Sequence, residues 1–209
     1  EQKSAQDAHA FSESVYSFDP HQKDLFPSNK SKLSPEVREG WWRAILTEWT
    51  SLLEYGAFKV VPIEESKGQK MFSALWVLKR KFSGTTSAIS RLKARLVVRG
   101  FEQRPGAHFD ESNLYAGVMM YSSLRTLLSM ATAKGFGISL RDVRNAYIQS
   151  DLPDELYMEL PEGFKEEGKC LRLTKALYGL RQAGHLWSNT FSGFLLSLIH
   201  ISEPTRPIR

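Results

Sequence analysis

The chain has 209 residues, 42% of them hydrophobic, and its 28 Lys and Arg outnumber its 23 Asp and Glu, giving a formal net charge of +5. These values exclude a wholly disordered chain and suit one large or two small domains, while the positive charge favours a polyanionic partner without identifying one. A single cysteine excludes an internal disulfide framework, and no apolar run approaches the roughly 18 residues of a membrane span.

The N-terminal part divides into a polar arm and a first helix. Residues 1–33 are rich in Ser, Lys, Gln and Asp and show no helical or strand period, so we expect a linker or disordered arm. The chain begins with Glu rather than Met, and we expect it to be a piece of a longer protein. A helix is then predicted with Ser34 as N-cap, Pro35 at the first helical position, Glu36 in the first turn and Gly56 as the stop.

Three short runs rich in β-branched and basic residues follow this helix, separated by Gly, Ser and Thr turns. They are "FKVVPI" at 58–63, "LWVLKRKF" at 75–82 and "LKARLVVRG" at 92–100. We expect them to form a small antiparallel sheet. With helices packed on that sheet, the fold class would be α+β.

A second helix is indicated by apolar residues spaced i, i+3, i+4 and i+7 between Leu124 and Ala131. Ser122 or Ser123 is its expected N-cap, and Gly135 its expected stop. The remaining elements are predicted as strands at 136–143, 156–160 and 171–174 and a helix at 185–196.

The last stretch, "SLIHISEPTRPIR" at 197–209, does not continue the patterns before it. It resembles the translated read-through of a sequencing-library adapter, and an ordinary polar tail is the alternative. We therefore predict a linker or disordered arm at 1–33, a folded unit at 34–195 and a foreign tail at 196–209.

Basic residues gather on one face of two of the predicted strands. In "LKARLVVRG" the strand period of two separates apolar side chains from basic ones, and "WVLKRKF" adds further cations to the same face. Arg suits phosphate because its planar fork donates two hydrogen bonds, and Lys acts as a point charge. A solvated sheet face is the alternative reading. The basic residues concerned are Lys79, Lys81, Lys93, Arg95 and Arg99.

Asp142 ends the apolar run "FGISLRDV", where an unpaired buried carboxylate would be unfavourable. Such a carboxylate requires a cation, either an Arg such as Arg141 or Arg144, or a Mg²⁺ ion held by oxygen ligands. Taken by itself, Asp142 fits a structural ion pair or a helix cap as well as a metal site.

Three phrases together are more specific than any one residue. "RLKARLVVRGFEQRPGAHFDES", "LRTLLSMATAKGFGISLRDVRNAYIQSDLPDELYMELPEGF" and "LRLTKALYGLRQAGHLW" occur in the order and spacing found in one family. The chain resembles the reverse transcriptase of copia-type LTR retrotransposons over residues 34–195. The resemblance implies the fingers and the first part of the palm of that polymerase.

The resemblance implies a metal role for Asp142. In that family the Asp of the "DV-x-NA-[FY]" phrase is the first of three catalytic aspartates that hold two Mg²⁺ ions, and here it is Asp142. The backbone carbonyl of Val143 would complete the metal shell in related polymerases.

Further positions correspond to nucleotide contacts in the family. Lys93 and Arg95 match residues of the fingers that contact the incoming triphosphate. Tyr147 matches the residue that packs under the deoxyribose and excludes a 2′-hydroxyl, with an ordinary core aromatic as the alternative. Gln182 lies in "LYGLRQAG", which corresponds to the phrase that lines the nucleotide and template pocket.

The sequence also departs from the family pattern. The family's second and third catalytic aspartates lie in a "YxDD" hairpin downstream of the "LYGLKQA" phrase, and this sequence contains no Asp-Asp pair. We therefore expect the chain to be truncated before that hairpin and inactive by itself. Pro is usual at the positions of Gly117 and Gly184, which suggests a decayed or divergent copy.

The function implied is that of a piece of an RNA-directed DNA polymerase. The intact parent would extend an RNA or DNA template-primer with deoxynucleoside triphosphates by two-metal nucleotidyl transfer. Its partners would include the integrase and RNase H of the Pol polyprotein, in a cytoplasmic virus-like particle or in the nucleus, without a membrane. The alternative is a non-catalytic, basic nucleic-acid-binding piece or an inert transposon relic.

Overall fold

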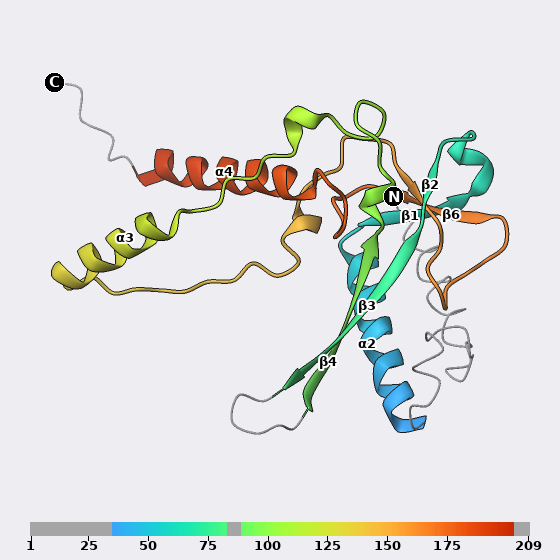
Figure 1. Ribbon diagram of the computed structural model, residues 1–209, viewed down its shortest axis with the longest axis horizontal. Helices are drawn as coiled ribbons and strands as arrows, with labels where there is room; N and C mark the ends of the chain where they lie inside the picture. The colour runs from blue at the N-terminus through green and yellow to red at the C-terminus, as the bar shows by residue number, and fades with distance from the viewer. Residues whose placement is uncertain (1–34, 83–88, 203–209) are drawn as a thin grey trace.

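The computed structural model describes residues 35–82 and 89–202 and shows an α+β fold (Figure 1). Helix α2 spans Pro35–Glu54, which confirms the first predicted helix. Gly56 follows it with φ +61°, a backbone conformation that glycine adopts without steric cost, and so ends the helix as predicted. The predicted arm at 1–33 and the predicted cap Ser34 lie outside the described residues.

The strands form two sheets rather than the single antiparallel sheet that was predicted. Four strands are ordered β1-β6-β5-β2, with β2 and β5 parallel, and the long strands β3 and β4 form a separate antiparallel hairpin. The run at 58–63 therefore joins a mixed sheet with distant strands, and its last residue belongs to a 3₁₀ turn. The strands are β1 (Phe58–Pro62), β2 (Met71–Phe72), β3 (Ala74–Phe82), β4 (Ile89–Val98), β5 (Tyr157–Met158) and β6 (Lys169–Leu173).

Two more helices follow. Helix α3 spans Tyr121–Ala133 and stops at Gly135 as predicted, but its N-cap is Met120 without a side-chain hydrogen bond, so a serine cap was wrong. Helix α4 spans Ala183–Ser202 and crosses the predicted boundary at 195, which itself stays a prediction. The 3₁₀ turns are η2 (Ile63–Ser66), η3 (Gly100–Glu102), η4 (Glu111–Asn113) and η5 (Tyr147–Gln149).

The core is an aromatic cluster between α2 and the sheets. Phe164 stacks on Trp49 with ring centroids 4.2 Å apart, and Trp42 and Trp76 lie 5.6 and 5.9 Å from the same ring. Trp76 is partly buried, and its indole nitrogen donates to the carbonyl of Glu162 at 3.0 Å, so its polar atom is satisfied. The cluster fixes the hairpin against α2.

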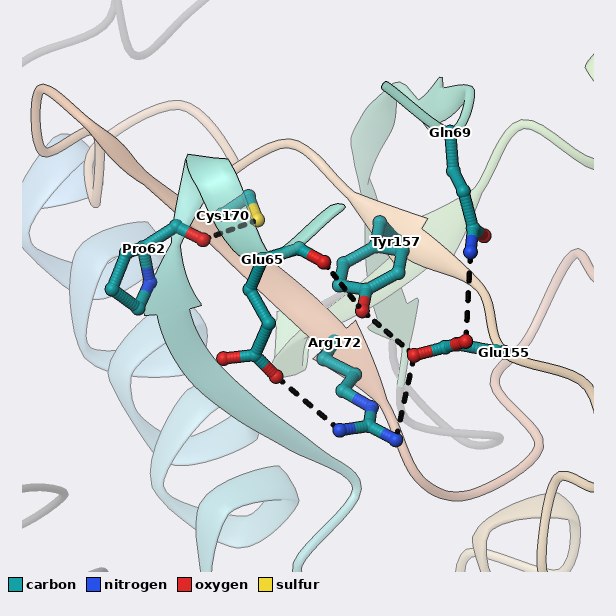
Figure 2. Close-up of polar contacts among 7 residues, drawn as sticks. All are labelled: Pro62, Glu65, Gln69, Glu155, Tyr157, Cys170 and Arg172. Carbon is teal, nitrogen blue, oxygen red and sulfur yellow. Dashed lines mark hydrogen bonds and ion pairs between the residues drawn. The ribbon is translucent and has the colours of Figure 1, made fainter. Parts of the chain in front are cut away.

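The opposite face of the four-stranded sheet carries a polar clamp (Figure 2). Arg172 lies 3.2 Å from Glu65 of η2 and 3.5 Å from Glu155, and the Tyr157 hydroxyl donates to Glu155 at 2.9 Å and to the Glu65 carbonyl at 3.2 Å. The hydroxyl also lowers the pKa of the Glu155 carboxyl by hydrogen bonding. Partly exposed ion pairs of this kind add little stability, and because these groups bond to one another we assign the clamp a structural role.

Residues 136–143 do not form the predicted strand. The segment is irregular, and neither sheet of the described residues includes it. Leu140 is 98% exposed and Ile138 is exposed as well. An apolar run becomes a strand only where another strand satisfies its backbone groups, and no described strand does so here.

Exposed apolar side chains occur along this segment and along the two helices, and we refer to them together as the apolar surface. In Figure 1, α3 and α4 extend from the sheets on the same side of the molecule. No helix within the described ranges has the length and hydropathy of a membrane span. The surface consists of Tyr121, Leu124, Leu127, Leu128, Met130, Ile138, Leu140, Phe191, Phe194, Leu195 and Leu198.

We expect the chain to self-associate through this surface, because association removes apolar area from water. Replacing Leu127, Leu140 and Phe194 by serine should shift sedimentation velocity profiles toward the monomer and reduce binding of a hydrophobic dye. Serine at Tyr55 and Ile63, which are exposed elsewhere, is the matched control and should change neither. A monomeric starting chain would contradict the prediction.

Candidate functional site

The β3–β4 hairpin has the predicted basic face. Lys79 lies opposite Lys93 and Lys81 lies opposite Arg91 in the antiparallel register. The alternate residues of β4 are buried in the core, as the strand period predicted. Arg99 comes after the last residue of β4, at the end of this face.

Like charges face each other across this hairpin. Directly opposed like charges destabilise a sheet pair. Burial and the nearby Arg95 guanidinium lower the pKa of the Lys93 ammonium, since both disfavour its charged form. The opposed cations destabilise the folded hairpin, and a bound anion would relieve their repulsion. The hairpin face is therefore suited to binding an anion.

Helix α2 supplies one acidic residue beside these cations. Burial raises the pKa of the Glu48 carboxyl, and the charges of Lys93 and Arg95 oppose that rise. The Leu96 backbone also hydrogen-bonds this carboxylate, so Glu48 covers part of the β4 edge that β3 leaves open. Glu48 follows Ile45 by three residues, beside the buried stripe of α2, which is why it is half-buried.

Tyr178 joins two of the predicted site residues. Its ring lies 5.2 Å from the guanidinium carbon of Arg95, and its centroid is 5.0 Å from that of Tyr147, with the planes inclined by 56°. Burial raises the pKa of the Tyr178 hydroxyl. Arg95 from the hairpin and Tyr147 from η5 therefore both lie beside the Tyr178 ring, although 52 positions separate them in the sequence (147 − 95).

Two glycines place Tyr178 against β4. The Tyr178 carbonyl accepts a hydrogen bond of 2.8 Å from the Val98 backbone N–H. Gly179 has φ +97°, and a Cβ atom there would lie 2.0 Å from the Val98 carbonyl oxygen; one at Gly100 would lie 1.9 Å from the Gly179 oxygen. Only glycine permits this backbone approach. Part of the "LYGLRQAG" phrase thus holds β4 in place.

Asp142 and Val143 lie outside the cluster, on the exposed irregular segment. The turn after them is fixed by Asn145, which has φ +51° and donates from its amide to the Ser51 hydroxyl of α2 at 3.1 Å. Asn tolerates this left-handed conformation better than most residues. The turn therefore orients Tyr147 but leaves Asp142 in solvent.

The described residues do not by themselves form a two-metal site. None of their His, Cys, Asp and Glu side chains gather in groups of three or more that could hold a metal ion. Asp142 provides one carboxylate, and several oxygen ligands must converge to hold Mg²⁺. The residues present thus do not fit two Mg²⁺ ions.

Gln182 is only 2% exposed, and its side chain is engaged by protein groups. Its amide nitrogen donates to Asp154 at 2.9 Å and to the His108 carbonyl at 3.2 Å, while its oxygen accepts from Gln103 at 3.0 Å. This geometry gives Gln182 a structural role, and its contact with a nucleotide stays a prediction.

The structure thus brings Lys93, Arg95 and Tyr147 into one region, with Lys79 opposite Lys93. It adds Glu48 and Tyr178, which the sequence reading missed. Two features of the sequence could have indicated these residues. Glu48 is a carboxylate beside the apolar stripe of α2, and Tyr178 directly precedes the Gly of "LYGLRQAG".

The comparisons with known proteins show which family the chain belongs to. Residues 55–206 match the family described as "Reverse transcriptase (RNA-dependent DNA polymerase)", and the chain belongs to this family. This confirms the resemblance to the copia-type enzyme.

The chain is similar to retrotransposon polyproteins of plants. It is 38% identical over 183 residues to the retrovirus-related Pol polyprotein from transposon TNT 1-94 of Nicotiana tabacum, covering 86% of this chain and 13% of that protein. It is 37% and 32% identical to those from transposons RE2 and RE1 of Arabidopsis thaliana, over 59% and 77% of this chain and 8% and 11% of theirs. No solved structure matches.

Proposed function

We propose that the chain is the fingers and the first part of the palm of a retrotransposon reverse transcriptase, whose parent copies RNA or DNA into DNA. The observation that carries this proposal is the basic face of the hairpin, joined through Tyr178 to Tyr147. A strand face with opposed cations suits a polyphosphate, and an adjacent aromatic ring suits a sugar or base.

The predicted basic residues and Tyr147 have separate roles in this proposal. Lys93 and Arg95 bind the phosphates of a deoxynucleoside triphosphate, and Tyr147 lies under its deoxyribose. Lys79, Lys81 and Arg99 contact the backbone of the template-primer. The proposed roles of these basic residues are supported by their position on one face of the hairpin.

Divalent metal would supply the charge stabilisation that phosphoryl transfer needs. We propose Mg²⁺, with Asp142 and the Val143 carbonyl as two of its ligands in the parent. The remaining ligands would come from other parts of the Pol polyprotein, which would also carry integrase and RNase H in a cytoplasmic particle.

A second function is favoured by the lack of a metal-binding cluster in the described part of the chain. The chain would then act as a non-catalytic nucleic-acid-binding piece. Both functions require the basic hairpin face, and only the first requires Tyr147 and Asp142.

The test is a titration of a labelled 20-base-pair primer-template at several salt concentrations. Replacing Lys93, Arg95 and Arg99 by alanine should weaken binding at least tenfold and flatten the slope of log affinity against log salt by about 2 to 3, because each phosphate contact contributes about 0.9. The control variant replaces three exposed basic residues on other elements by alanine and removes the same total charge. These residues are Arg43 on α2, Lys59 on β1 and Arg125 on α3, and most of the salt slope should remain in this variant. If both triple variants behave alike, the hairpin face is only solvated.

A further inference from the structure

The Tyr178 ring occupies a position between two functional elements. It lies 5.2 Å from the Arg95 guanidinium carbon and 5.0 Å from the centroid of the Tyr147 ring. Arg95 belongs to the hairpin and Tyr147 to η5, and both are half-buried. The side chains proposed for phosphate and for sugar therefore share one aromatic support.

We propose that Tyr178 is a positioning residue of the nucleotide site, which holds the Arg95 guanidinium at a fixed place relative to Tyr147. The inference rests on the proposed function. It goes beyond that function because it assigns a task to a residue that need not touch the nucleotide.

The backbone fixes where the Tyr178 ring lies. Its carbonyl is bonded to the Val98 N–H at 2.8 Å, and Gly179 packs directly on the Val98 carbonyl and the Val97 side chain. Val98 is also buried in the core. Tyr178 is therefore tied to the strand that carries Arg95, three residues before Val98.

Stacking on a ring selects one arrangement of an otherwise flexible side chain. An Arg side chain carries about 2 kcal/mol of rotamer entropy, and ordering it before the ligand binds removes part of that entropic loss from binding. The Arg95 side chain also hydrogen-bonds the Tyr178 hydroxyl, so the ring and the hydroxyl together restrict where the guanidinium lies. The Glu48 carboxylate lies near the same cations and offsets their mutual repulsion.

The binding experiment uses the full chain and inorganic tripolyphosphate, with dTTP and UTP as further ligands. Tyr178→Leu should weaken tripolyphosphate binding five- to twentyfold, and Tyr178→Phe, which keeps the ring but loses the hydroxyl that hydrogen-bonds Arg95, should weaken it by a smaller factor. Adding Tyr178→Leu to Arg95→Ala should cause little further loss, since the ring acts through the guanidinium. Tyr55→Leu, an exposed Tyr at the end of α2, is the control.

A second measurement separates positioning from general destabilisation. Phenylglyoxal modifies exposed guanidinium groups, and peptide mass spectrometry reports each Arg separately. In Tyr178→Leu the modification of Arg95 should accelerate severalfold while that of the exposed Arg43 is unchanged, and in Tyr178→Phe, which keeps the ring, the acceleration at Arg95 should be smaller. Equal acceleration at both arginines would show partial unfolding and overturn the inference.

The two failures are distinguishable. If the unmodified chain and Arg95→Ala bind tripolyphosphate equally, the proposed function is wrong, and the modification rates still decide whether Tyr178 holds Arg95. If Arg95→Ala loses affinity and Tyr178→Leu does not, the nucleotide site stands and the positioning role of Tyr178 is wrong.

Discussion

Replacing Gly179 by alanine should lower the free energy of unfolding by about 3 kcal/mol or more, because it adds a backbone clash and a strained φ to one residue. The new Cβ would lie 2.0 Å from the Val98 carbonyl oxygen and 2.7 Å from a Val97 methyl group, so β4 would have to move. Thermal unfolding followed by circular dichroism should show a midpoint lower by roughly 10 °C.

Gly184 gives the matched control for this substitution. It lies in the same phrase, at the start of α4, and a methyl group added there would have the Ala116 Cβ as its nearest neighbour, at 3.5 Å. Gly184→Ala should leave the midpoint unchanged or raise it slightly, since alanine favours helix by about 1 kcal/mol over glycine. Equal midpoints for the two variants would refute the close approach of Gly179 to β4.

This 209-residue chain by itself should show no template-dependent primer extension with Mg²⁺ or Mn²⁺. Asp142 is one exposed carboxylate, and no group of three metal-binding side chains occurs among residues 35–82 and 89–202. In-line phosphoryl transfer by two metals requires several convergent ligands. The measurement is extension of a labelled primer on an RNA template, resolved by gel electrophoresis.

An active polymerase run in parallel shows that the assay works, and Asp142→Asn is the matched variant of this chain. Both the unmodified chain and the variant should stay at background. Extension by the unmodified chain that disappears in Asp142→Asn would overturn the prediction and make the chain an enzyme by itself.

Local signals in the sequence predicted the helices well. Pro35 and Gly56 bracket α2, and Gly135 ends α3, since each of these residues has a direct effect on the backbone. The predicted N-cap of α3 was wrong. A serine near the start of a helix is a cap only when its side chain accepts a hydrogen bond from a free backbone N–H. Met120 precedes the helix without such a bond.

Strands were predicted less completely, because their partners are distant. The alternation in β4 correctly separated buried from basic side chains. The pairing of β1 with β6 had no local signal, and the run at 136–143 has the composition of a strand but no described partner. Composition indicates that a segment can pair, whereas pairing depends on the rest of the fold.

The candidate site combines residues that the sequence suggested with supporting residues that it did not reveal. Lys93, Arg95 and Tyr147 were identified by their types and by the family phrases. Tyr178 and Glu48 acquire their importance only from contacts across the fold. Gln182 was predicted from a family phrase but is buried in the fold. A sequence phrase does not reveal whether a polar residue within it is exposed or buried.

The pairing of β1 with β6 has a consequence for synthesis of the chain. Cys170 of β6 contacts the Pro62 carbonyl of β1 across 108 positions, whereas the β3–β4 hairpin closes locally. At about 5–20 residues per second, the ribosome would release β6 roughly 5 to 20 seconds after β1. During that interval the basic hairpin can already form, while the tryptophans of α2 remain without Phe164 and are open to chaperones. Nascent chains of this protein would thus attract polyanions before they are folded.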